Sequence, residues 1–159
     1  MEKDLIVQGV SYEADIIRLT IGYDAYEESV VADIVTVLAE NGIDIDMIVQ
    51  VLMDDRTSTI SFSMEKEAFA KALRLLESSK LSLGFSFADF EVGLAKVSLA
   101  GSAIGSNPRI KARMFTRLSR EGIQVKMISS SEYKMSVVVS QGEMMRAANA
   151  LHNEFHVGC

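Results

Sequence analysis

A repeat in the sequence constrains the fold of this chain more than any other feature. The segment AENGIDIDMIVQ (39–50) recurs as SREGIQVKMISS (119–130). Both copies have a Gly-Ile step, an alternating apolar stretch and a Met-Ile pair. A repeat of this length indicates one structural unit used twice. The 159 residues therefore predict two small units that share a core.

The first half of the chain has the pattern of a βαββαβ unit. Alternation of apolar and polar residues predicts strands at 16–21, 44–52, 58–64 and 86–92. One-face apolar spacing predicts a helix that Ser29 caps and Gly42 ends, and a second helix over 65–79. This order is typical of a ferredoxin-like unit, an antiparallel sheet with two helices on one face.

The second half repeats the order but lacks the last strand. Strands are predicted at 96–99, 124–131 and 134–140, and helices from Asn107 to Gly122 and over 143–155. The segment 5–12 is the expected substitute for the missing strand, because an unpaired sheet edge is unfavourable. The fold class is therefore α+β, with two ferredoxin-like units. The first, 16–92, is inserted into the second, which comprises 4–15 plus 95–157.

The predicted strands carry more apolar residues than two helices per unit can cover. These residues are Ile17, Leu19, Ile21, Val137 and Val139. Unpaired outer strands add to the same problem. A homodimer is therefore expected.

Composition excludes several classes of protein. A net charge of −6 and a pI near 4.9 leave no basic stripe for a phosphate backbone, so no nucleic acid partner is expected. No window reaches the ~18 apolar residues of a membrane span, and the N-terminus lacks a signal-peptide pattern. The one cysteine, Cys159, cannot form a disulfide within the chain. A soluble, cytoplasmic protein without membrane contact is expected.

The sequence contains no recognisable catalytic constellation. GSAIGSNP (101–108) matches neither the P-loop nor the dinucleotide pattern, so no cofactor is expected. His152 and His156 are four residues apart on a helix but lack a third ligand, and we expect solvated histidines and no metal. Asp44 and Asp46 share a strand face without a nucleophile nearby.

A binding site for an amino acid fits the pattern better. In each unit the first strand leads through a loop to a helix N-terminus, whose N–H groups and dipole suit a carboxylate. A neighbouring strand that carries Asp or Gln can meet an ammonium group. The two features together describe an amino-acid site.

Four segments resemble the C-terminal regulatory region of aspartate kinase, a tandem of ACT domains. They are IDMIVQ (45–50), GSNP (105–108), KMISSSEYKMSVVV (126–139) and ALHNEF (150–155). The likeness covers essentially the whole chain, and it begins at Met1 as in separately translated β subunits of the family.

The resemblance implies a non-catalytic regulatory function. It implies two ACT domains in the interleaved arrangement, a homodimer through pairing of ACT sheets, and feedback control by lysine, threonine or both. The implied partner is an aspartate kinase catalytic domain or α subunit.

The resemblance also implies positions for the effector, which in the family lies between ACT units. There it contacts the first loop of one unit and the second strand of another. The matching strand positions are Asp46, Met47, Gln50, Gln124, Val125, Ser131 and Glu132. The matching loop positions are Ser106, Asn107, Arg109 and Ile110. DAYEES (24–29) departs from the Asp-Lys-Pro-Gly loop that the family often has, and this bulky loop is expected to shrink or abolish the first site.

Two other functions are compatible with parts of this pattern. A free-standing tandem ACT sensor, controlling a transcriptional or metabolic partner, would have the same fold. A small hydrolase of the acylphosphatase kind needs a phosphate-binding arginine in the first loop, and GYDAYEE (22–28) has none. The regulatory region of an aspartate kinase is the leading hypothesis.

Overall fold

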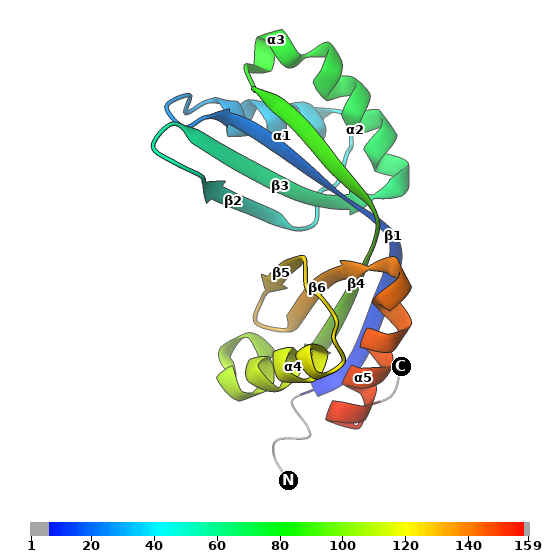
Figure 1. Ribbon diagram of the computed structural model, residues 1–159. Helices are drawn as coiled ribbons and strands as arrows, with labels where there is room; N and C mark the ends of the chain where they lie inside the picture. The colour runs from blue at the N-terminus through cyan, green and yellow to red at the C-terminus, as the bar shows by residue number, and fades with distance from the viewer. Residues whose placement is uncertain (1–6, 158–159) are drawn as a thin grey trace. The chain divides into compact units, whose positions relative to one another are not determined.

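The computed structural model describes residues 7–157, which form two compact units (Figure 1). One unit spans 16–92 and is called the central unit. The other, called the split unit, consists of the residues before 16 and after 92. Cys159 and the part of the expected strand before residue 7 lie outside the described residues.

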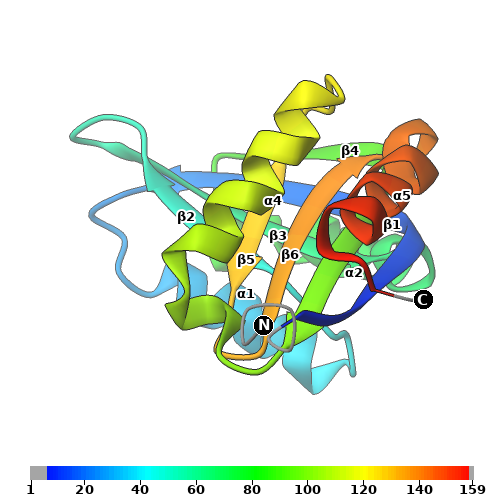
Figure 2. The same ribbon diagram turned by 90° about the horizontal axis from the view of Figure 1, so that it is seen from below.

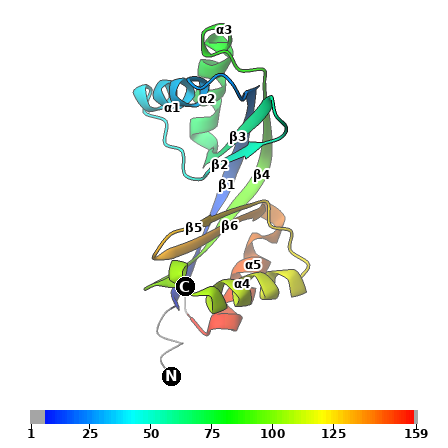
Figure 3. The same cartoon turned by 90° about the vertical axis from the view of Figure 1, so that its left-hand side faces the viewer.

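The central unit contains a four-stranded sheet in the order β2-β3-β1-β4. Its strands are β1 (Val7–Asp24), β2 (Ile48–Leu52), β3 (Thr57–Glu65) and β4 (Phe87–Gly101). Its helices are α1 (Val30–Glu40), α2 (Lys66–Ser78) and the short α3 (Lys80–Leu83). Both β1 and β4 continue into the split unit. Figure 3 shows α1 and α2 on the same side of this sheet.

One face of this sheet packs on the helices. Leu19 of β1 pairs with Phe62 of β3, and both side chains are fully buried. Ile34 of α1 and Leu76 of α2 belong to the same apolar cluster. The alternation along β3 thus places Ile60, Phe62 and Met64 in the core, as the pattern predicts.

The split unit repeats this architecture with the strand order β1-β4-β6-β5. After β4 come η2 (Ile104–Ser106), α4 (Pro108–Arg120), β5 (Met127–Ser130), β6 (Lys134–Ser140), η3 (Gln141–Glu143) and α5 (Met144–Phe155). Figure 2 shows α4 and α5 over the same face of the sheet. Met114 of α4 and Leu151 of α5 meet Val97 and Val137 in its core.

The apolar strand faces are covered within the chain, so the part of the sequence argument for a homodimer that rests on uncovered apolar residues is wrong. Ile17 is 4% exposed, and Leu19, Ile21, Val137 and Val139 are 0% exposed. Two helices per unit suffice because each contributes several large side chains to the cluster.

The Gly-Ile repeat forms the same helix ending in both units. The N–H groups of Gly42 and Ile43 donate to Ala39 and Leu38 carbonyls, each at 3.0 Å. Gly122 and Ile123 make the same two bonds after α4, also at 3.0 Å. The φ angles of the two glycines are 68° and 70°, which confirms the predicted left-handed ends.

The strands differ in length from the prediction. The described part of the segment expected at 5–12 and the segment expected at 16–21 belong to one strand, β1, which begins at Val7. The segments expected at 86–92, from Phe87 on, and at 96–99 are parts of β4. The pattern misses the continuity of β1 because residues 11–15 are all exposed and do not alternate. Conversely, β2 and β5 are shorter than the strands predicted at 44–52 and 124–131, and they begin at Ile48 and Met127. The residues just before them make only isolated backbone hydrogen bonds to the neighbouring strand.

Alanine at Gly42 or Gly122 should destabilise the chain through the backbone alone. A Cβ would meet no atom within 4 Å at either position, so the cost comes from the positive φ angle. We expect a loss of about 1 kcal/mol in the free energy of unfolding for each substitution. Urea denaturation measures it.

Gly142→Ala is the matched control, because Gly142 has no neighbour within 4 Å and no positive φ angle. This substitution should change the free energy of unfolding by about 0.5 kcal/mol or less. Equal losses in all three variants would contradict the backbone explanation.

Candidate effector site

In the split unit, the loop and the turn that carry predicted effector residues lie in direct contact. The N–H of Gly105 donates to the Glu132 carbonyl at 3.2 Å, and the N–H of Gly101 donates to the Tyr133 carbonyl at 2.9 Å. A Cβ on Gly105 would lie 2.0 Å from the Ser131 carbonyl oxygen. Only glycine therefore allows the η2 loop and the β5–β6 turn to approach this closely.

Helix α4 begins at this contact. The Asn107 side chain accepts the N–H groups of Arg109 at 3.1 Å and Ile110 at 3.3 Å, and Pro108 is at the first helical position, so the predicted Asn-Pro cap is confirmed. Ile110 is buried, whereas Ser106 and Arg109 are exposed. An exposed guanidinium beside the positive end of a helix dipole makes this region attractive to a carboxylate.

The β5–β6 turn presents polar groups to the same end of the split unit. The Ser131 N–H donates to the Lys134 carbonyl at 2.8 Å, and Glu132 is exposed. The predicted residues that the structure brings together are Ser106, Asn107, Arg109, Ile110, Ser131 and Glu132.

Gln124 and Val125 lie elsewhere in the split unit. They precede β5, whereas Ser131 follows it, and seven residues of extended chain span roughly 20 Å. Gln124 is exposed, and Val125 packs against the core. Within one split unit, Gln124 and Val125 therefore lie apart from the η2 loop and the β5–β6 turn.

The corresponding loop of the central unit has a different structure. The N–H of Ala25 donates to the Arg56 carbonyl at 2.7 Å, so this loop also lies beside a hairpin turn. The Asp24 carboxylate accepts the N–H of Tyr26 at 3.0 Å, and the Tyr26 side chain is 72% exposed. Ser29 is at the N-cap position but makes no side-chain capping bond, contrary to the prediction. The start of α1 thus lacks the side-chain cap that α4 has.

Asp54 fixes the hairpin turn next to this loop. Its carboxylate accepts the N–H groups of Arg56 and Thr57, both at 2.8 Å. These two bonds hold the pKa of Asp54 below its ordinary value, because both favour the charged carboxylate. The bond from Arg56 has the larger effect and the bond from Thr57 the next largest. Asp54 is therefore an ionised turn residue.

The remaining predicted residues lie on or before β2. Asp46 is exposed, and its N–H donates to the Ser63 carbonyl at 3.0 Å. Met47 is 3% exposed, and its N–H donates to the Ser63 hydroxyl at 3.0 Å. The Gln50 side chain donates to the hydroxyl of Tyr23. These contacts fix the backbone of the stretch and leave the Asp46 side chain at the surface.

Sequence reasoning did not single out Tyr23 or Gly105. Tyr23 is 4% exposed, and its hydroxyl accepts a bond from a residue on β2, with β3 between the two strands. The only feature of the sequence that could have identified Tyr23 is its position, as an aromatic residue just before a polar loop. Gly105 lies in the GSNP segment, but its contact with Ser131 depends on tertiary structure.

The described residues offer no metal cluster. Within residues 7–157, no group of three His, Cys, Asp or Glu side chains could bind a metal ion. His156 is exposed, whereas the Nε2 atom of His152 is buried and has no hydrogen-bond partner in the described part of the chain, so the expectation of two solvated histidines is wrong for His152. No helix in the same range is long and apolar enough to cross a membrane.

Three comparisons indicate relatives of the chain. Residues 97–155 match the family model described as ACT domain. An aspartokinase from Bacillus sp. (strain MGA3) is 40% identical over 157 residues, which are 99% of this chain and 38% of that protein. The chain thus spans less than two fifths of the length of this relative.

Solved structures give the same result over almost the whole chain. The ligand-free regulatory subunit of aspartate kinase from Thermus thermophilus has a TM-score of 0.86 and 29% identity, covering 94% of this chain and 99% of that one. A crystal structure of aspartokinase alpha and beta subunits has a TM-score of 0.84 and 29% identity, with the same coverage. Over almost its whole length the chain therefore matches the regulatory region of aspartate kinases, which is built of ACT domains.

Proposed function

We propose that this chain senses an amino acid for an aspartate kinase and gives feedback inhibition by lysine, threonine or both in aspartate-family amino-acid biosynthesis. The strongest support is the contact of Gly105 with the turn at Ser131 and Glu132. It places two chemically complementary segments at one end of the split unit. The match to a whole regulatory subunit supports the same function.

The exposed groups at this contact suit the two ends of an amino acid. Arg109 and the start of α4 offer positive charge to a carboxylate. Glu132 offers a carboxylate to an ammonium group, and Ser131 offers a hydroxyl. The start of α1 has an exposed Tyr26 in this place and no capping side chain, so we propose that the split unit has the stronger site.

We propose that a second copy of the chain completes each site. β2 and β5 are the outermost strands in the sheet order, and their exposed apolar residues include Ile48 at 54%, Leu52 at 64% and Ile128 at 50%. Pairing of these edges would satisfy their open backbone groups. It would also bring Asp46 or Gln124, which precede the edges, to the loop of another unit.

The proposed partner is the catalytic part of an aspartate kinase, as a domain of the same protein or as an α subunit. The effector would bind one arrangement of the regulatory region more tightly than another and so shift the kinase equilibrium. We place this assembly in the cytoplasm.

The first prediction of the proposed function concerns Asp46. If its exposed carboxylate meets the ammonium group of the effector, the charge-assisted bond contributes roughly 1.5–3 kcal/mol. Asp46→Ala should weaken binding of L-lysine or L-threonine by on the order of tenfold to a hundredfold in calorimetric titrations. Kinase reconstituted with this variant should resist feedback and keep its uninhibited rate.

Asp44→Ala is the control for this experiment, because Asp44 is an exposed carboxylate in the same stretch, next to the helix junction. It should matter less than Asp46→Ala. Unchanged binding of both amino acids by Asp46→Ala would move the site to Ser131 and Glu132.

The second prediction concerns Gly105. In Gly105→Ala the new Cβ would lie 2.0 Å from a backbone oxygen of the β5–β6 turn, so the loop and the turn must separate. Feedback inhibition should then be lost, while circular dichroism still shows a folded chain. Gly142→Ala, in the same unit but without a close neighbour, should keep normal inhibition. Normal inhibition in Gly105→Ala would show that the contact is unimportant for the effector.

The third prediction concerns assembly. Sedimentation at micromolar concentration should give twice the chain mass of 17.5 kDa. Leu52→Lys on the β2 edge should weaken this dimer, because it places a charge in the proposed interface. Leu81→Lys, at a 99% exposed leucine of α3, should not. A monomer with and without amino acids would refute the proposed assembly.

A further inference from the structure

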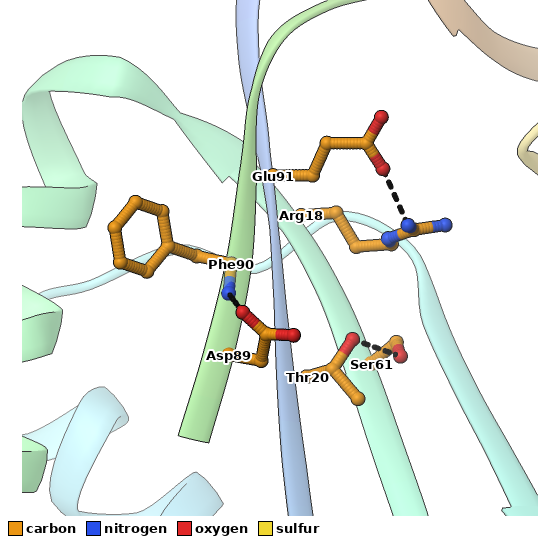
Figure 4. A network of polar contacts seen from close by, with 6 residues as sticks. All are labelled: Arg18, Thr20, Ser61, Asp89, Phe90 and Glu91. Atoms are coloured by element: carbon orange, nitrogen blue, oxygen red, sulfur yellow. Dashed lines mark hydrogen bonds and ion pairs between the residues drawn. The ribbon is translucent and has the colours of Figure 1, made fainter.

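The central unit has a second polar feature, on the sheet face opposite its helices. Leu19 points to the helices, so its neighbours Arg18 and Thr20 lie on the other face. Thr20 is paired in register with Ser61, and their hydroxyl oxygens are 2.8 Å apart. Figure 4 shows these side chains together with Asp89 and Glu91 of β4.

A hollow of about 210 Å³ lies among these residues. Its lining residues are Arg18, Thr20, Asp89, Phe90 and Glu91. The Phe90 ring points to the helix-covered face, where it packs against Phe69 of α2 in a tilted arrangement, with 4.9 Å between the ring centroids. Phe90 therefore borders the hollow with its backbone and not with its ring. The hollow is open to solvent, since Asp89 and Phe90 are exposed. Its volume leaves room for a small organic molecule at the surface of the sheet.

The charges in the hollow have both signs. Arg18 donates from one guanidinium nitrogen to Glu91 at 2.5 Å, and the side chains are 30% and 32% exposed. A guanidinium has five N–H donors, so this single bond leaves donors for another anion. Asp89 uses one carboxylate oxygen to accept the N–H of Phe90 at 2.8 Å, which leaves its other oxygen as an acceptor.

This arrangement selects the chemistry of a ligand. A simple anion would be repelled by the two carboxylates of Asp89 and Glu91. A metal ion would lack a third ligand in the described residues and would meet the charge of Arg18. A zwitterion satisfies both signs, with its carboxylate at Arg18 and its ammonium group at Asp89.

We propose that this hollow is a second binding site for a free α-amino acid, separate from the effector positions on the loops and edge strands. The hydroxyl of Thr20, which lines the hollow and is bonded to that of Ser61, favours an amino acid that carries a polar side chain. The site lies wholly within the central unit, so it does not require a second copy of the chain. It does not rest on the proposed function.

Backbone NMR of the full chain, titrated with L-threonine, tests this site. We expect saturable shifts of the amide signals of Thr20, Phe90 and Glu91. Asp89→Asn keeps the shape of the side chain and removes its charge, so it should raise the Kd reported by these signals at least tenfold. N-acetyl-L-threonine has no ammonium group and should not produce the shifts.

Glu67→Gln is the matched control, because Glu67 is an exposed carboxylate on α2, away from the hollow. It should leave the Kd unchanged. Thermal unfolding at an unchanged temperature would confirm that Asp89→Asn folds. Shifts confined to signals near Asp46 or Ser131, or an unchanged Kd in Asp89→Asn, would overturn the second site without touching the proposed effector site.

Discussion

The Gly-Ile helix ending is the constraint on which both units depend. A left-handed glycine reverses the chain, and the following isoleucine enters the core, where Ile43 and Ile123 are each 6% exposed. This fixes the phase of the next residues, since neighbouring side chains of extended chain alternate. Asp44 is consequently exposed after Ile43, and Gln124 after Ile123. The repeat in the sequence therefore defines which side chains are exposed just before the edge strands β2 and β5.

The two units use the same architecture with different loop chemistry. In the split unit, the Asn107 side chain caps α4, and Gly105 brings the preceding loop close to the β5–β6 turn. In the central unit, Ser29 leaves α1 without a side-chain cap, and Tyr26 projects into solvent. The two units thus share one fold while their loops differ, so the fold alone does not determine which loop can bind a ligand.

Much of the fold was predictable because apolar periodicity reports burial. Strand and helix order followed from it, whereas the continuity of β1 did not, since its exposed middle has no alternation. The site was less predictable. The resemblance gave positions, but only the structure separates Gln124 from Ser131 and joins Gly105 to that turn. The pairing of Arg18 with Glu91 joins residues 73 positions apart, and no local pattern reports such a contact.

A site between two copies and a hollow within one unit have different consequences for regulation. Ligand at an interface binds only the assembled form, so it stabilises assembly by RT ln(1 + [L]/Kd), about 2.7 kcal/mol at a hundredfold excess over Kd. Its occupancy therefore depends on protein concentration and on the partner. A ligand in the hollow at Arg18 and Asp89 would stabilise the central unit alone. It would influence the proposed kinase partner only if the two arrangements proposed for the regulatory region shaped that hollow differently, because a ligand with equal affinity for both states shifts neither.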